Sequence, residues 1–131
     1  FTSAYTKAGL SPDGSSTYFL PRRIGDRRAR ELMLTNRVLS AAEAESWGLV
    51  NQVVPEDQLT EATQALISMM TTGPTRAFGA VKRLLNESSH TSLETQMELE
   101  TREIASCAMS EDGREGINAF LAKRAPTYHG Q

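Results

Sequence analysis

The chain has 131 residues, of which 39% are hydrophobic and 23% charged, and its formal net charge is −2 at pH 7. This length suits one domain that buries a real core, and the slightly acidic balance argues against a dominant nucleic-acid or membrane-surface role, because both need a positive field. Cys107 is the single cysteine, which excludes an internal disulfide and fits a reducing compartment. Without a long apolar run, a signal peptide or a transit pattern, we expect a cytoplasmic protein with no membrane partner.

The sequence starts at Phe1, inside a segment that alternates aromatic and small residues. This pattern predicts a short strand over residues 1–5. Because no methionine precedes Phe1, we expect the chain to be a fragment. Residues before it would then supply the rest of any binding site.

A turn over residues 9–14 displays a single carboxylate, that of Asp13. Pro12 fixes its own φ and Gly14 relieves steric limits, so the backbone dictates the geometry at Asp13. Catalytic acids are often displayed on such turns, but the local pattern by itself favours a plain turn or cap residue. Ser15, Ser16 and Thr17 are predicted to cap the helix that follows.

Two helices are predicted after this turn. The first follows Ser15 and is interrupted by Pro21 and Gly25. The second is capped by Asp26 and carries arginines opposite an apolar face. That apolar face consists of Ala29, Leu32, Met33 and Leu34.

A third helix is marked by Ser40 and Glu43, which have the spacing of a capping box. Gly48 is expected to end it in the left-handed conformation. Residues 37–39 before it are predicted to form no more than a strand or a bridge, and residues 49–54 after it a short strand.

The remainder of the chain has helical periodicity. Pro55 begins a helix that runs to about Thr72, and the dipeptide 73–74 breaks it and starts another. A long helix rich in glutamate follows, and Ser110 caps the last helix, which Pro126 ends. We expect the five methionines to fill the core.

The arginines between residues 22 and 30 are a candidate phosphate site, because guanidinium groups match phosphate oxygens and keep their charge. A solvated helix face explains the cluster about as well. The cluster comprises Arg22, Arg23, Arg27, Arg28 and Arg30. His90 and His129 lack ligand spacing, so no metal site is predicted, and Cys107 has no local histidine for nucleophilic catalysis.

The last predicted helix ends with an aromatic residue followed by two cations. Phe120 could stack on a planar ring while Lys123 binds a phosphate, which together make half of a nucleotide site. The helix dipole would stabilise cations at this position in any protein, so a purely structural interpretation also holds.

The order of these motifs resembles the C-terminal half of the crotonase superfamily, the enoyl-CoA hydratases and isomerases, along the whole chain. The most specific part is Leu39-Ser40-Ala41-x-Glu43-Ala44 with Trp47-Gly48-Leu49-Val50. Further matches are Phe1, Gly9, Pro12, Thr17, Leu20-Pro21-Arg22, Ile24-Gly25, Leu34-Thr35, Val53-Val54-Pro55, Gly73-Pro74, Lys82, Asp112, Glu115-Gly116 and the run from Phe120 to Pro126. The Leu-x-Pro-Asp turn and the Leu-Pro-Arg sequence are most similar to the phenylacetate-pathway ring-opening isomerase branch.

The resemblance implies an α/β fold, the C-terminal part of the ββα spiral of crotonases, mostly helical with short strands. Residues 1–72 would form the end of the spiral core with the catalytic turn, and residues 73–131 a helical trimerisation region. The expected partners are an acyl-CoA thioester and further copies of the chain, in a homotrimer or a dimer of trimers. No separate cofactor is expected, because CoA is part of the substrate.

The resemblance also implies an enzyme that stabilises a thioester enolate with two backbone N–H groups, both from the preceding half. The isolated chain is therefore expected to be inactive. Tyr5 stands where hydratases carry their second glutamate, and a phenol with a pKa of about 10 is a poor base at neutral pH. Asp13 falls where some isomerases and a dehalogenase carry the working carboxylate. Tyr5, Pro12 and Gly14 are expected to bind substrate, and Phe120 and Lys123 to contact CoA from a neighbouring subunit.

The preferred hypothesis is a CoA-thioester isomerase in which Asp13 shuttles a proton. Hydration with Asp13 as the sole acid and base is the alternative within the enzyme class. A non-catalytic acyl-CoA-binding module is a second class, suggested by Ser15-Ser16 where the family has Gly-Gly. Nucleic-acid binding through the arginine cluster is a third and weaker hypothesis.

Overall fold

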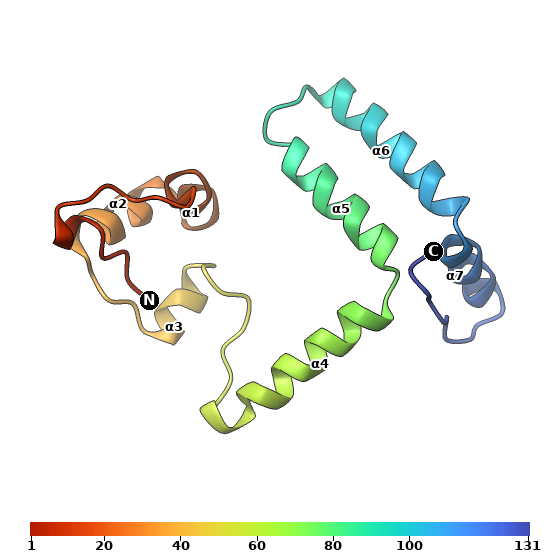
Figure 1. Ribbon diagram of the computed structural model, residues 1–131, viewed down its shortest axis with the longest axis horizontal. Helices are drawn as coiled ribbons and strands as arrows, with labels where there is room; N and C mark the ends of the chain where they lie inside the picture. The colour runs from red at the N-terminus through yellow and green to blue at the C-terminus, as the bar shows by residue number, and fades with distance from the viewer. The chain divides into compact units, whose positions relative to one another are not determined.

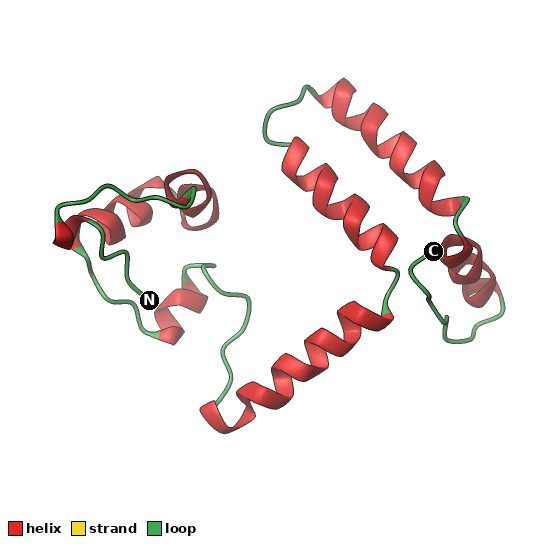
Figure 2. Cartoon of the chain, viewed as in Figure 1, coloured by secondary structure: helices red, strands yellow, loops and turns green.

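The computed structural model describes all residues, 1–131, and consists of helices and loops without a strand (Figures 1 and 2). It divides into two compact units, Phe1–Gln58 and Leu59–Gln131. The sequence predicted a different kind of division, after residue 72, between the spiral core and a trimerisation region. That division stays a prediction. No helix combines the length and the apolar character that crossing a membrane requires.

The first unit is built around two packed helices, α1 and α2. Its elements are η1 (Thr6–Ala8), α1 (Ser16–Ile24), α2 (Asp26–Thr35), α3 (Ala41–Ser46) and η2 (Glu56–Gln58). Its buried apolar side chains are Ile24, Ala29, Leu32, Met33, Leu39 and Ala44. Three of the four apolar positions predicted for α2 are thus buried, whereas Leu34 is exposed.

The predicted short strands do not form, because a strand needs a neighbouring strand to receive its hydrogen bonds. Phe1 and Leu39 exchange one reciprocal pair of main-chain bonds, both 2.8 Å long, and no ladder continues from it. In the segment 49–54, the N–H of Leu49 donates to the Ala44 carbonyl at 2.8 Å, so that amide is bonded to α3. The short strands expected at 1–5 and 49–54 are therefore absent, and so is the strand or bridge expected at 37–39.

The capping box at Ser40 is confirmed. Its hydroxyl accepts from the Glu43 N–H at 3.2 Å, and the Glu43 carboxylate accepts from the Ser40 N–H at 3.0 Å. Helix α3 ends at Ser46, and Gly48 follows with a φ of 75°, the left-handed conformation expected of it.

The predicted caps of α1 and α2 are wrong. Ser15 stands at the N-cap of α1 with a φ of 61°, and its side chain forms no cap hydrogen bond. Thr17 lies inside α1. Asp26 is the first residue of α2, after the N-cap Gly25, and its carboxylate accepts from Arg30 at 2.6 Å instead.

Pro21 was expected to interrupt the first helix, but it lies inside α1. The Gly25 N–H donates to the Pro21 carbonyl at 2.9 Å, so helical bonding continues past the proline. Gly25, with a φ of 83°, ends the helix as expected.

The second unit contains four helices: α4 (Leu59–Thr72), α5 (Thr75–Glu87), α6 (Leu93–Ala108) and α7 (Glu111–Leu121). The helix predicted from Pro55 begins as the single turn η2 and continues as α4 to Thr72. Helices α5 and α6 lie side by side (Figure 1). Arg83 and Glu103 link them through a salt bridge with a 3.0 Å contact.

The cap predicted for the last helix is confirmed, since the Ser110 hydroxyl accepts from the Gly113 N–H at 3.0 Å. The predicted end at Pro126 is wrong. Helix α7 ends at Leu121, and Lys123 has a φ of 53°, which turns the chain away before the proline.

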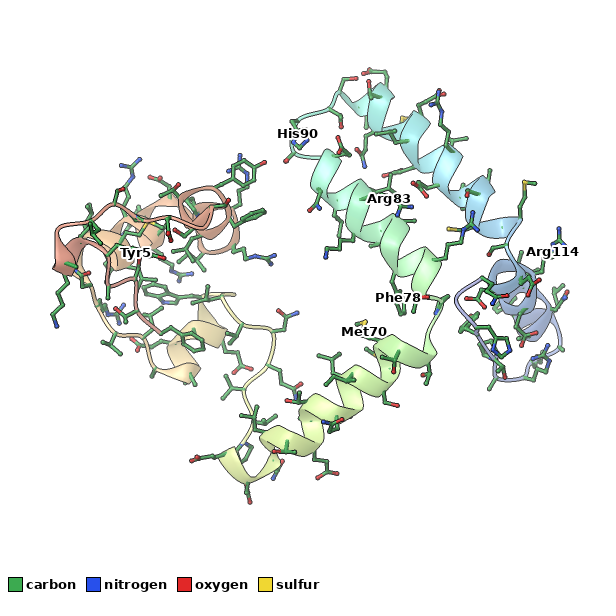
Figure 3. All side chains as sticks on the ribbon, viewed as in Figure 1. Tyr5, Met70, Phe78, Arg83, His90 and Arg114 are labelled. Carbon is green, nitrogen blue, oxygen red and sulfur yellow. The ribbon has the colours of Figure 1, made fainter.

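The methionines do not all fill the core. Met33 is buried, whereas the other four are exposed: Met69, Met70, Met97 and Met109. Three of these lie on α4 or α6, helices of which no residue is buried, and Met109 directly follows α6. Figure 3 shows Met70 on α4.

Candidate active site

The turn before α1 displays Asp13 on a constrained backbone. Gly14 and Ser15, at its two central positions, have φ values of 58° and 61°, the signs that define a type I′ turn. The carbonyl of Asp13 accepts from both the N–H and the hydroxyl of Ser16, at 3.1 and 2.7 Å. Since α1 begins at Ser16, the exposed Asp13 carboxylate is presented at the start of a helix.

Tyr5 and Asp13, eight residues apart, meet through a side-chain hydrogen bond. The Tyr5 hydroxyl donates to Oδ1 of Asp13 at 2.7 Å. This hydrogen bond and the nearby carboxylate charge raise the pKa of Tyr5 above its usual 10.0. The phenol therefore stays protonated at neutral pH and acts as a donor, not as a base.

The loop after Tyr5 folds back on itself. The Tyr5 carbonyl accepts from the N–H groups of Ala8 and Leu10, at 2.9 and 3.0 Å, and Gly9 has a φ of 72°. The adjacent Thr6 hydroxyl donates to the Met33 carbonyl at 2.7 Å, which fastens the loop to α2. Figure 3 labels Tyr5 within this unit.

The predicted substrate-binding residues Tyr5, Pro12 and Gly14 all lie on this loop and turn beside Asp13. Pro12 is half-buried and Gly14 exposed, with open space where a Cβ would stand. Their contact with a substrate stays a prediction.

Phe120 and Lys123 lie in the second unit, at and just after the end of α7. The Phe120 side chain is 82% exposed at the last turn of α7, and the exposed Lys123 follows the helix. Such an exposed ring and cation are available to a planar ligand and an anion, but their role in binding CoA stays a prediction.

The arginine cluster is largely engaged within the chain. The Arg22 guanidinium lies 3.6 Å from the Tyr18 ring centroid, Arg28 lies 5.0 Å from that of Trp47, and Arg30 pairs with Asp26. Three of the five guanidinium groups thus have aromatic or carboxylate partners in the chain, which favours a structural role over a shared phosphate site.

Sequence reasoning missed a cluster that we call the C-terminal clasp: Asp112, Glu115 and Arg124, with residues 127–131. The buried Asp112 carboxylate accepts from the N–H groups of His129 and Gly130, at 2.7 and 2.8 Å. Arg124 binds Glu115 and lowers the pKa of its carboxyl to about 2. The available signal was the spacing of Asp112 and Glu115, which puts both on one helix face.

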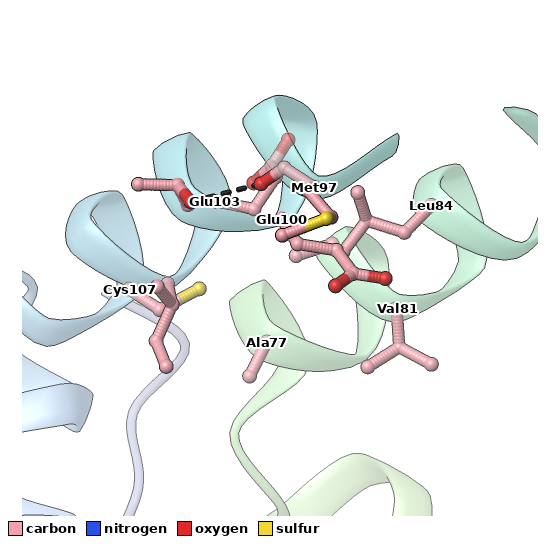
Figure 4. A pocket seen from close by; sticks show the side chains of 10 residues that line it. Ala77, Val81, Leu84, Met97, Glu100, Glu103 and Cys107 are labelled. Carbon is pink, nitrogen blue, oxygen red and sulfur yellow. Dashed lines mark hydrogen bonds between the residues drawn. The ribbon is translucent and has the colours of Figure 1, made fainter. Parts of the chain in front are cut away.

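An apolar groove separates α5 and α6 (Figure 4). It holds a cavity of about 560 Å³. Its lining includes Ala77, Val81, Leu84, Met97, Ile104 and Cys107. Cys107 was predicted to lie in an apolar helical stretch, and its place in this groove agrees with that prediction.

No group of three or more His, Cys, Asp or Glu side chains is placed to hold a metal ion.

The family model described as enoyl-CoA hydratase/isomerase matches residues 1–131. The chain belongs to the enoyl-CoA hydratase/isomerase family. This membership confirms the resemblance to the crotonase superfamily that the order of motifs indicated.

The relatives within the enoyl-CoA hydratase/isomerase family carry different activities in their names. The 1,2-epoxyphenylacetyl-CoA isomerase of Escherichia coli strain K12 is 40% identical over 131 residues, which are 100% of this chain and 50% of that protein. A protein assigned as an enoyl-CoA hydratase in Rhodobacter capsulatus is 36% identical over 131 residues. These residues are 100% of this chain and 51% of that protein. The family is therefore established, whereas the reaction of this member is not fixed by its relatives.

The solved structures of the enoyl-CoA hydratase/isomerase family share the fold. A structure from Mycobacterium abscessus assigned to the family superposes with a TM-score of 0.95 at 34% identity, over 100% of this chain and 50% of that one. The chain thus spans about half the length of the relatives it matches, which supports its assignment to the C-terminal part of a crotonase fold.

Proposed function

We propose that the complete protein carrying this chain is an isomerase of acyl-CoA thioesters in which Asp13 moves a proton between two carbons of the acyl group. The observation that carries the proposal is the Asp13 carboxylate itself, exposed on a turn fixed by its neighbours on both sides. The isomerase name of the Escherichia coli relative supports it.

The proposed reaction needs one carboxylate and no oxidant or reductant. Asp13 takes a proton from the carbon next to the thioester of a 3-enoyl-CoA, and the electron pair of that C–H bond enters a thioester enolate. The protonated Asp13 then returns the proton to the carbon two positions further along, and the double bond moves into conjugation with the thioester. Asp13 ends as a carboxylate, so the cycle balances.

Hydration is the second candidate, because the Rhodobacter capsulatus relative is assigned as a hydratase. Hydration by two carboxylates is disfavoured here, since Tyr5 takes the place of one and its raised pKa keeps the phenol protonated. A hydratase would therefore have to use Asp13 for both proton transfers. Direct assay of water addition to a 2-enoyl-CoA separates the two reactions.

CoA recognition by Phe120 and Lys123 is part of the proposal. The exposed Phe120 ring offers a stacking surface for adenine, and the Lys123 ammonium offers a charge for a phosphate. Replacement of Lys123 by glycine, which accepts its φ of 53°, removes the ammonium and its aliphatic stem without straining the backbone. Its expected effect is a KM for CoA thioesters raised roughly 10-fold with kcat kept, about the cost of one charged hydrogen bond.

Assembly into trimers through residues 73–131 is likewise proposed. It is supported by apolar side chains that the isolated second unit leaves more than two-thirds exposed: Leu93, Ile104, Met109, Phe120 and Leu121. Sedimentation equilibrium of the complete protein measures the number of subunits, and a monomer would contradict this part of the proposal.

The decisive experiment replaces Asp13 by asparagine in the complete protein. We expect migration of the double bond in a 3-enoyl-CoA to slow by at least about 100-fold, the usual contribution of a general acid and base, while CoA-thioester binding measured by calorimetry persists. Asp57→Asn removes the same charge outside the site and should leave turnover unchanged. Wild-type turnover by Asp13→Asn would contradict the proposal, and binding without turnover by the wild type would favour a non-catalytic module.

A further inference from the structure

We infer that Tyr5 is a positioning residue for Asp13: its hydroxyl holds Oδ1, so that Oδ2 is the oxygen that exchanges the proton with the substrate. The 2.7 Å hydrogen bond from the Tyr5 hydroxyl to Oδ1 carries this inference. It rests on the proposed function, because it assigns roles to the two oxygens of the proposed proton carrier.

Tyr5 is the one side chain that donates a hydrogen bond to the Asp13 carboxylate. A carboxylate attached through a single Cβ can rotate about χ2, whose profile is broad. A single charge-assisted donor at 2.7 Å restricts this rotation through Oδ1 and leaves Oδ2 without a donor. The two oxygens of Asp13 are therefore not equivalent.

The donor is itself held in place. The Tyr5 carbonyl accepts two main-chain hydrogen bonds from its own loop, and the Thr6 hydroxyl fastens the loop to the Met33 carbonyl of α2. The Asn36 amide adds a hydrogen bond to the Thr6 oxygen at 2.9 Å. Because the phenol ring has only two side-chain torsions, a fixed Tyr5 backbone leaves its hydroxyl little freedom.

The acceptor is held from the other side. Pro12 fixes φ before Asp13, and Ser16 binds the Asp13 carbonyl through both its N–H and its hydroxyl. Two independently fastened segments thus bring one donor and one acceptor to hydrogen-bond distance. The Asp13 carboxylate is therefore oriented before substrate binds, so little further conformational entropy is lost when it takes up the proton.

Tyr5 keeps its own proton throughout the proposed cycle. While Asp13 is ionised, the phenol donates to Oδ1, and when Oδ2 carries the proton taken from carbon, Oδ1 remains an acceptor as the carbonyl oxygen. The proton therefore moves only between carbon and Oδ2. Tyr5 acts on the reaction through Asp13 and makes no bond to the migrating proton.

Kinetics of Tyr5→Phe in the complete protein test the inference, because this change removes one oxygen and keeps the ring. We expect kcat for isomerisation to fall roughly 10- to 100-fold, the range of a hydrogen bond to a charged group, with KM within about twofold of the wild type. Tyr128→Phe removes a phenol hydroxyl in the other unit and should leave both constants unchanged.

The outcomes separate this inference from the proposed function. Wild-type kcat in Tyr5→Phe, alongside an inactive Asp13→Asn, would overturn the positioning role and leave the isomerase proposal standing. Wild-type activity in Asp13→Asn would instead remove the proposed function and with it the inference.

A spectroscopic titration tests the contact without relying on activity. With tyrosine labelled at Cζ by ¹³C, the signal that Tyr5→Phe removes is assigned to Tyr5. The Tyr5 signal should titrate above the ordinary phenol range in the wild type, and at lower pH in Asp13→Asn, where the carboxylate charge is gone. An unchanged titration in Asp13→Asn would overturn the inference.

Discussion

Arg124 binds the carboxylate of Glu115 through both terminal nitrogens, at 2.6 and 2.7 Å. The Thr127 N–H adds a third hydrogen bond to the same carboxylate at 2.9 Å. These bonds fasten the segment after α7 back onto the helix, next to the buried Asp112 that accepts from His129 and Gly130. The Arg124 hydrogen bonds, followed by that of Thr127, lower the pKa of the Glu115 carboxyl from 4.5 to about 2.

This lowered pKa predicts a defined loss of stability in acid. A carboxyl whose pKa is lower in the folded than in the unfolded state stabilises the fold fully above its unfolded pKa, and the stabilisation disappears as the pH falls toward the folded pKa. For Glu115 the window runs from about pH 4.5 down to about pH 2. Thermal melts across this window should show a shallower pH dependence for Glu115→Gln than for the wild type.

Glu111→Gln is the matched control for that experiment, because it removes the same charge from the same helix. It should leave the slope between pH 4.5 and 2 closer to that of the wild type. Equal slopes for Glu115→Gln and the wild type would mean that the contact with Arg124 does not persist in solution.

Replacing glycine by alanine should have opposite effects on the free energy of unfolding at two helical positions, Gly113 and Gly79. A Cβ on Gly113 would stand 2.0 Å from the carbonyl oxygen of Cys107, which is backbone and cannot swing aside. Gly113→Ala should therefore lower the free energy of unfolding by more than about 3 kcal/mol. A Cβ on Gly79 meets only the flexible Arg83 side chain at 3.4 Å, so Gly79→Ala should raise it by about 0.5–1 kcal/mol.

Urea unfolding of both alanine variants measures this contrast. A Gly113→Ala midpoint equal to that of the wild type would show that the close approach of α6 to α7 is absent. A Gly79→Ala variant less stable than the wild type would show that Arg83 cannot yield to the added methyl group.

Ser15 and Ser16 should respond differently to glycine, although the family resemblance places glycine at both. Ser15 has a φ of 61°, which costs an L-residue about 1–2 kcal/mol, so Ser15→Gly should stabilise the fold by up to about 1 kcal/mol after the entropic cost of glycine. Ser16 lies in α1 and its hydroxyl donates to the Asp13 carbonyl. Ser16→Gly should therefore destabilise the fold by about 1–2 kcal/mol. In differential scanning calorimetry, the melting temperature of Ser15→Gly should lie above that of the wild type and that of Ser16→Gly below it. The reverse order would contradict the idea that Ser15 is strained and that Ser16 stabilises the turn.

Helix caps with a complete local signature were predictable from the sequence. The box of Ser40 with Glu43 and the cap at Ser110 both formed as predicted, because donor and acceptor lie within three residues of each other. Asp26 and Ser15 carry cap-forming side chains but no cap bond. There the backbone dihedrals before each helix, which the neighbouring turn imposes, decide the position of the side chain.

The turn that carries Asp13 was predictable from the sequence, but the contacts that hold it in place were not. Pro12 and Gly14 indicated that Asp13 stands on a tight turn, and the turn formed. That Tyr5 donates to Asp13 could not be predicted, because the contact depends on the loop at Gly9 folding back and on Thr6 fastening it to α2. Similarly, no local pattern shows that Asp112 accepts from amides 17 and 18 residues away.

The family, the order of the helices and the carboxylate on the turn were all predictable from the sequence, since each is carried by short local motifs and by their order along the chain. Tertiary structure decided the absence of strands, the exposure of four methionines and the pairing of Tyr5 with Asp13. A strand needs a partner to accept its hydrogen bonds, an apolar face needs a surface to cover it, and a side-chain pair needs two segments fastened at the right distance. These conditions are set by the folded chain as a whole and not by any one segment.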